Sequence, residues 1–293
     1  MIFDEATLRK LSTLSLVARQ VRAGVFQGER RSSKRGTSIE FADYRDYVAG
    51  DDLRRVDWNV YARLNRLYIK LLEDEEDLAV YFLLDASDSM NWGLGEQHKF
   101  TYARRLAAGL TSVALSVGDR INIEVLLAAG KAKGYGPARG GHHLMNALAF
   151  LESLATAGST NLTASLKGFS LERRRPGMVV LLSDLFSPNG FESGLAAIQG
   201  HGHEVVVLHV LAPDELDPPL VGDLQLIDLE TGDKQDVSLD NSLRKQYEMR
   251  VISWREEIRE FCQSRSMQYL ALSTDDPWER VILRDLRAAG VVQ

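Results

Sequence analysis

The chain has 293 residues, 45% of them hydrophobic and 26% charged, which is typical of a globular protein with room for a sizeable core. Its formal net charge of -6 argues against a nucleic-acid binder, because such proteins usually present a basic surface. Its single cysteine, Cys262, the absence of a signal-peptide pattern and the lack of an apolar run near roughly 18 residues together predict a cytoplasmic protein without a membrane span.

The first part of the chain predicts an N-terminal helix followed by an α+β extension. Apolar residues recur at helical spacing over 8–21, and Gly24 is a plausible end of that helix. Residues 39–76 are rich in polar and aromatic side chains, and alternation over 67–72 indicates a strand before the acidic turn at 73–77. We expect residues 1–76 to form this extension and residues 77–293 to form the main domain.

Strands and helices alternate through the rest of the chain. Strands are predicted at 78–84, 121–127, 178–182, 204–211 and 269–272, with an edge strand at 131–138 and a hairpin at 224–237. Helices are predicted at 99–117, 144–154, 161–173, 191–199 and 277–289, with a long helix after Asp240. This order predicts an α/β fold: a doubly wound, mostly parallel, Rossmann-like sheet with helices on both faces.

Oxygen-bearing side chains follow two of the predicted strands. Asp85, Ser87 and Ser89 come at the end of the first apolar strand, Asp184 ends another, and Thr160 lies in a polar loop. Ligands of such sheets bind where the carboxyl ends of the strands meet, so these residues are expected to converge. Carboxylates and hydroxyls are ligands for Mg²⁺, or for another divalent cation such as Mn²⁺ or Ca²⁺. Any one of these residues alone would be better explained as the cap of a turn or of the next helix.

The complete pattern resembles the metal-ion-dependent adhesion site (MIDAS) of von Willebrand factor A domains. The resemblance implies that Ser87 and Ser89 bind Mg²⁺ directly and that Asp85 acts largely through water. Thr160 and Asp184 would bind directly or through water. A carboxylate of a protein partner would take the remaining position, since a cation held by few carboxylates keeps a positive charge.

The residues that precede this pattern, at 36–63, point to one family among the von Willebrand factor A-like proteins. The stretches 36–41, 44–47, 50–54, 56–58 and 62–63 are similar to the signature of the bacterial domain-of-unknown-function 58 family, which is von Willebrand factor A-like. The resemblance implies a chaperone-like adaptor that works with a MoxR-type AAA+ ATPase in the assembly or maturation of protein complexes. Many relatives carry membrane segments upstream, whereas this sequence shows none.

The charged residues of the signature allow two interpretations. They could form a buried ion-pair network that docks the extension, or a surface that faces a partner. We expect the structural role, because the interleaved aromatic residues Phe41, Tyr47 and Trp58 favour burial.

The alternative function is a metal-dependent phosphohydrolase that uses Asp85 as its nucleophile. Haloacid-dehalogenase phosphatases use Asp in this way and require a second Asp two residues after it. This chain has Ser87 at that position. A nucleophile also needs an activating partner, and none stands out nearby. The chain lacks a Gly-x-x-x-x-Gly-Lys-Ser/Thr loop for binding ATP phosphates. We therefore expect a binding protein with no catalytic residues.

Overall fold

The computed structural model describes residues 5–18, 39–48, 51, 56–74, 77–127, 133–218, 222–227, 234–239 and 241–293. The chain divides into two compact units, one of residues 28–77 and one of residues 1–27 with 78–293.

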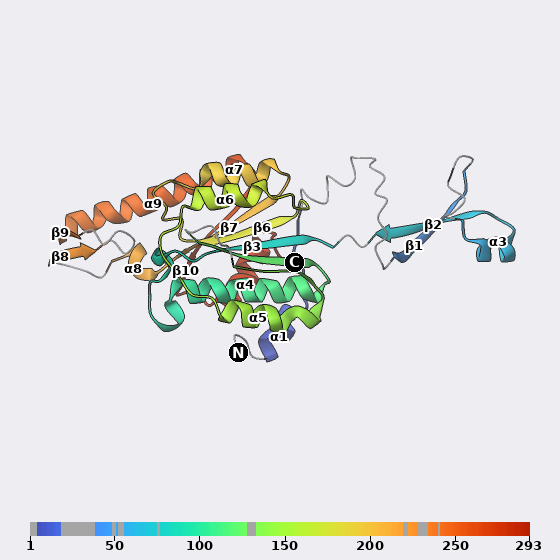
Figure 1. Cartoon of the computed structure of the whole chain (residues 1–293), viewed down its shortest axis with the longest axis horizontal. Coiled ribbons are helices and arrows are strands. Elements are labelled where there is room, and N and C mark those ends of the chain that lie inside the picture. The colour runs from blue at the N-terminus through green and yellow to red at the C-terminus, as the bar shows by residue number, and fades with distance from the viewer. Residues whose placement is uncertain are drawn as a thin grey trace. The chain divides into compact units, whose positions relative to one another are not determined.

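The larger unit is built on a six-stranded sheet with the order β10-β7-β6-β3-β4-β5 (Figure 1). The strands are β3 (Ala79–Asp85), β4 (Arg120–Leu126), β5 (Gly134–Arg139), β6 (Met178–Ser183), β7 (Glu204–Leu211) and β10 (Gln268–Ser273). All neighbouring pairs are parallel except β4 and β5, which are antiparallel. The predicted mixed α/β fold with a mostly parallel sheet is therefore confirmed.

Helices cover both faces of this sheet, as Figure 1 shows. Helices α4 (Lys99–Ser116) and α5 (Leu144–Glu152) lie on one face; α6 (Leu162–Leu171), α7 (Glu192–Gly200) and α9 (Asn241–Ser264) lie on the other. Side chains of a strand alternate between faces. Accordingly, Val80 and Phe82 of β3 belong to the core beneath α4, and Ala79 and Tyr81 belong to the opposite core.

Shorter elements complete the larger unit. They are η2 (Asp88–Met90), η3 (Gly95–Gln97), η4 (Gly141–His143), α8 (Pro213–Leu216), the hairpin of β8 (Gly222–Ile227) and β9 (Lys234–Leu239), α10 (Trp278–Arg280), the π-helical turn η5 (Val281–Asp285) and α11 (Leu286–Ala288). The helix predicted at 277–289 is thus a helical run interrupted by a π turn.

The N-terminal helix is shorter than predicted. Helix α1 (Glu5–Leu11) ends at Leu11, and the chain then pairs with the C-terminus through an antiparallel bridge between Leu16 and Val292. The backbone N–H of Ser15 donates to the carbonyl of Gln293 at 3.1 Å. Leu11, Leu14 and Leu16 are buried although only part of this segment is helical, so apolar spacing alone did not identify the strand-like pairing. Residues 19–24 of the predicted helix lie outside the described residues.

This N-terminal segment packs with the main domain, not with the extension to which the sequence assigned it. Leu11, Leu14 and Leu16 lie in the core that α4 covers. The physical reason is the pairing with residues 291–293, which closes the N- and C-terminal segments over one side of the sheet.

The smaller unit contains an antiparallel pair of β1 (Ile39–Asp46) and β2 (Tyr68–Asp74), and helix α3 (Trp58–Leu64). Asp57 caps α3, since its carboxylate accepts hydrogen bonds from the N–H groups of Asn59 and Val60. Trp58 is 56% exposed, contrary to the burial we expected. Signature residues 36–38, 50 and 52–54, and the side chain of Phe41, lie outside the described part.

None of the helices in the described ranges combines the length and the apolar character that crossing a bilayer requires.

Helices α6 and α7 face each other, and their packing positions the loop before α6. Gly168 on α6 and Gly194 on α7 allow this packing to be tested through stability. A Cβ on Gly194 would lie 2.7 Å from the Cβ of Leu166 on α6, whereas a Cβ on exposed Gly168 would meet nothing within 4 Å. We expect Gly194→Ala to lower the free energy of unfolding by about 1–3 kcal/mol through overpacking. Gly168→Ala should raise it by up to about 1 kcal/mol, because alanine favours a helix. Urea unfolding measures both, and a stabilising Gly194→Ala would contradict this packing.

Candidate metal centre

The five predicted metal ligands lie at the carboxyl edge of the central strands. Asp85 is the last residue of β3, and Asp184 directly follows β6, its parallel neighbour. Ser87 and Ser89 lie in the turn after β3, and Thr160 lies in the loop before α6. All except Ser89 are at least nine-tenths buried. Parallel pairing thus brings residues separated by about a hundred positions to one edge, as the sequence predicted.

Hydrogen bonds fix the Asp85 carboxylate from two sides. Its Oδ1 accepts from the backbone N–H of Ser87 at 3.0 Å, and its Oδ2 accepts from the Ser183 hydroxyl at 2.6 Å. The hydroxyl oxygens of Ser87 and Ser89 lie 2.9 Å apart. The turn therefore holds two hydroxyls next to an oriented carboxylate.

The loop that carries Thr160 is joined to this turn by backbone hydrogen bonds. The N–H of Ala157 donates to the carbonyl of Ala86 at 2.8 Å, and the N–H of Asp88 donates to the carbonyl of Gly158 at 2.9 Å. In return, the N–H of Gly158 donates to the Asp88 carboxylate at 3.0 Å. Gly158 has a φ of +69°, a conformation that glycine adopts without strain.

The Thr160 hydroxyl is buried and has no hydrogen-bond partner within the described structure. A buried polar group of this kind carries a free-energy cost of about 1–3 kcal/mol unless something satisfies it. A cation coordinated at this edge would satisfy it, because a hydroxyl oxygen is a ligand for Mg²⁺.

Lys99 is a part of the site that the sequence analysis missed. Its ammonium group is fully buried and donates to the carboxylates of Asp184 at 2.7 Å and Glu215 at 2.6 Å. It also lies 5.2 Å from the ring centre of Phe186. The signal in the sequence was a lysine at the first position of an apolar helix, where the helix dipole disfavours a positive charge. Such a lysine needs carboxylate partners if it is buried.

The charges of the cluster are unbalanced. Three carboxylates, those of Asp85, Asp184 and Glu215, accompany one ammonium group, that of Lys99. Burial, together with the nearby charge of Asp184, raises the pKa of Asp85 to about 6. Burial also raises the pKa of Glu215, against the opposing effect of Lys99. A divalent cation would offset the uncompensated negative charge, so the electrostatics fit the oxygen ligands.

A neutral histidine holds the backbone of Asp184 in place through a hydrogen bond. His209 of β7 is buried, and its Nε2 lies 3.0 Å from the backbone carbonyl of Asp184. Its Nδ1 lies 2.8 Å from the hydroxyl of Tyr269 on β10. Burial lowers the pKa of His209 to about 3, so the ring stays neutral and donates from Nε2 while accepting from Tyr269.

The residue types of the site distinguish it from the more common metal centres. Across the described ranges, no three His, Cys, Asp or Glu side chains lie close enough to hold a metal ion by themselves. Any cation at this edge must therefore rely on the hydroxyls of Ser87, Ser89 and Thr160 as well as on carboxylates.

Comparison with known proteins places the chain in a family. Residues 43–257 match the family described as "Protein of unknown function DUF58". The chain is 29% identical to uncharacterized protein Rv1480 of Mycobacterium tuberculosis and, equally, to uncharacterized protein Mb1516 of Mycobacterium bovis. In both cases the match covers 97% of this chain and 90% of the relative. The chain belongs to the DUF58 family.

The matches among solved structures are more distant in sequence. One is BatB, a conserved hypothetical protein of Bacteroides thetaiotaomicron, with 16% identity, a TM-score of 0.44, and coverage of 72% of this chain and 98% of that one. Another is the pilus adhesin SpaC of Lactobacillus rhamnosus GG, with 11% identity, a TM-score of 0.47, and coverage of 75% and 32%. Neither likeness assigns a function to this chain.

Replacing Lys99 tests the buried charge cluster. Lys99→Met removes the ammonium group and leaves two carboxylates uncompensated, so we expect a loss of about 3–5 kcal/mol in the free energy of unfolding. The matched control is Arg105→Met on the same helix, which breaks an ion pair whose Glu96 side chain is 84% exposed. That change should cost no more than about 1 kcal/mol. Urea unfolding with EDTA measures both, and equal losses would contradict the assigned role of Lys99.

Proposed function

We propose that this DUF58 chain is a non-enzymatic protein-interaction module of the von Willebrand factor A type. It binds Mg²⁺, or another divalent cation such as Mn²⁺ or Ca²⁺, at Asp85, Ser87, Ser89, Thr160 and Asp184. The observation that carries the proposal is the unsatisfied, buried Thr160 hydroxyl in a loop hydrogen-bonded to the Asp85 turn.

The residues of the site suit different roles in holding the cation. Ser87 and Ser89 present adjacent hydroxyls and would bind directly. Asp85 already accepts two hydrogen bonds, so it would act mainly through water. The Asp184 carboxylate accepts from the backbone N–H of Phe186 at 3.1 Å as well as from Lys99, which leaves it fewer free lone pairs for a metal.

The bound cation would supply an open coordination position for a carboxylate of a protein partner. Three of the five proposed ligands are hydroxyls, which bring no negative charge. Lys99 further offsets the charge of Asp184. These residues therefore leave the site able to attract an external carboxylate.

The surroundings of the site suit a protein partner. Three large apolar side chains in the adjacent loops are exposed: Trp92 (40%), Leu94 (88%) and Phe186 (41%). Trp92 and Leu94 follow the serine turn, and Phe186 comes two residues after Asp184. Exposed aromatic and apolar side chains of this kind are typical of protein interfaces.

The surroundings of Asp85 favour binding over phosphohydrolysis. Asp85 is only 4% exposed, and hydrogen bonds occupy both of its oxygens. A carboxylate nucleophile needs access to its substrate and a general acid or base nearby. Asp184, the ionisable group whose charge acts on Asp85, is bound to Lys99, which is also bound to Glu215.

The partner we propose is a MoxR-type AAA+ ATPase, with which the chain would act as an adaptor in the assembly or maturation of other protein complexes. This part of the proposal rests on family membership. It is consistent with a site that recognises a carboxylate.

Replacing Thr160 tests the metal site. Thr160→Val keeps the shape and removes the unsatisfied hydroxyl. We expect the free energy of unfolding in EDTA to stay equal or to rise by about 1 kcal/mol, because the buried hydroxyl no longer lacks a partner. Binding of Mn²⁺, followed by calorimetry, should weaken by at least about tenfold.

The matched control is Thr111→Val in α4, because the Thr111 hydroxyl is also buried without a partner but lies away from the site. It should have a similar effect on stability and none on Mn²⁺ binding. Unchanged Mn²⁺ affinity in Thr160→Val would contradict the proposed ligand set.

Binding of the ATPase tests the partner. A purified MoxR-type ATPase from the same organism should be retained by the wild-type chain in Mg²⁺. It should be lost in EDTA and with the double variant Ser87→Ala/Ser89→Ala. Ser153→Ala serves as the control, since this exposed hydroxyl directly after α5 bonds, within the described residues, only to the carbonyl of Phe150. Equal retention under all these conditions would contradict docking through the metal.

A further inference from the structure

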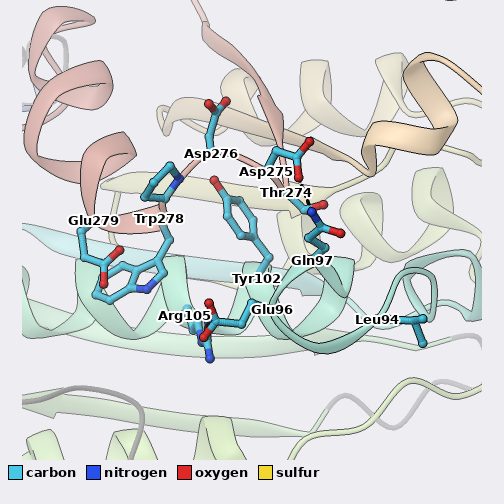
Figure 2. Close-up of a pocket in the computed structure, with 11 residues that line it drawn as sticks. Leu94, Glu96, Gln97, Tyr102, Arg105, Thr274, Asp275, Asp276, Trp278 and Glu279 are labelled. Carbon is cyan, nitrogen blue, oxygen red and sulfur yellow. Dashed lines mark hydrogen bonds and ion pairs between the residues drawn. The ribbon is translucent and has the colours of Figure 1, made fainter.

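A polar cavity of about 570 Å³ lies in the larger unit, apart from the metal centre. Figure 2 shows that α4 with the preceding turn η3 forms one wall, and that the segment 274–279 after β10 forms the other. Its carboxylates are those of Glu96, Asp275, Asp276 and Glu279, and Arg105 is the cation among its lining residues. The cavity is therefore acidic.

Two buried hydroxyls of this cavity have no hydrogen-bond partner. Tyr102 is 2% exposed and Thr274 is 5% exposed, and neither hydroxyl is satisfied within the described structure. In Figure 2 the Tyr102 ring extends from α4 with its hydroxyl toward the segment that carries Asp276. Burial raises the pKa of Tyr102, and nearby Asp276 adds to this effect, so the phenol is neutral. Both hydroxyls are free to accept an N–H.

The cavity contains more carboxylates than partners for them. Asp276 pairs with Arg280 at 2.6 Å, and Glu96 pairs with Arg105 at 3.1 Å. Asp275 accepts only a neutral amide N–H, from Gln97. Half-buried Glu279 forms no ion pair with any other residue in the described ranges. Among the described residues, the negative charges of Asp275 and Glu279 are thus without a cation.

The spacing of these groups favours an organic cation over a metal ion. Within the described residues, no three of the carboxylates lie close enough to share a metal ion. An ammonium or guanidinium group carries several N–H donors and can address separated acceptors at once. The aromatic walls formed by Tyr102 and Trp278 add favourable contact for such a cation.

We propose that this cavity binds an organic cation with a guanidinium or primary ammonium group. Its N–H groups donate to the hydroxyls of Tyr102 and Thr274, and its charge is balanced by Asp275 and Glu279. The same chemistry is offered by a small free amine and by the Arg or Lys side chain of a polypeptide. This inference does not depend on the metal centre.

Calorimetry with matched probes tests the proposal. Butylguanidinium and butylammonium carry the cation, butylurea is the uncharged counterpart of the first, and a capped Gly-Arg-Gly peptide represents a polypeptide source. We expect the wild-type chain to bind the cations and not butylurea, with affinity that falls as salt is added. Tighter binding of the peptide would identify a polypeptide as the source, and tighter binding of the small cations would identify a free amine.

Variants locate the binding. Glu279→Gln and Tyr102→Phe should each weaken binding of butylguanidinium by about tenfold, since each removes a charge-assisted interaction. Glu260→Gln, the same change on the exposed face of α9, should leave it unchanged and controls for net charge. Thermal unfolding shows that each variant is folded; Tyr102→Phe is expected to be folded because it removes an unsatisfied hydroxyl. Equal binding of butylurea, no binding of any cation, or undiminished binding by both variants would overturn the proposal.

Discussion

The buried ion pair between Lys99 and Asp184 is the interaction on which the carboxyl edge of the sheet depends. Lys99 begins α4 and Asp184 follows β6, so the pair joins a helix from one face of the sheet to the end of a central strand. Leaving either charge unpaired in this interior would cost several kcal/mol, about 3–5 for a typical buried pair. The pair also draws Glu215 of α8 into the cluster, which makes the edge both rigid and negatively charged.

A rigid, negative edge suits the binding of a cation, and the bound cation would in turn attract a carboxylate of the protein partner. The hydrogen bonds to Asp85 from Ser87 and Ser183 are formed in the free chain, so the turn needs little rearrangement to receive a cation. Of the five proposed ligands, Thr160 has a buried hydroxyl without a hydrogen-bond partner in the described structure. The Asp85 carboxylate is held in place by hydrogen bonds, and the Thr160 hydroxyl has lone pairs available for a cation. Together these features support a site that exchanges ligands without refolding.

Features that depend on a local pattern of residues could be predicted from the sequence. Features that depend on contacts between distant residues could not. Apolar runs ending in polar residues located β3, β6 and the five candidate ligands, because a parallel sheet places its strand ends together. Lys99 and Glu215 were missed, since they are separated by more than a hundred positions and no local pattern links them. The segment after Leu11 was assigned to a helix because Leu14 and Val17 fit helical spacing, whereas the structure pairs this segment with the C-terminus through Leu16 and Val292.

The metal centre and the acidic cavity are connected through the beginning of one helix. Lys99 donates to Asp184 of the first, and Gln97, two residues earlier, donates to Asp275 of the second. Exposed Leu94 lies in the same stretch and lines the cavity. A polypeptide that placed a carboxylate at the cation and a basic side chain in the cavity would contact both sides of this stretch. Because the two sites require opposite charges, such a surface would reject a uniformly acidic or uniformly basic segment, and this would give specificity beyond that of a single carboxylate.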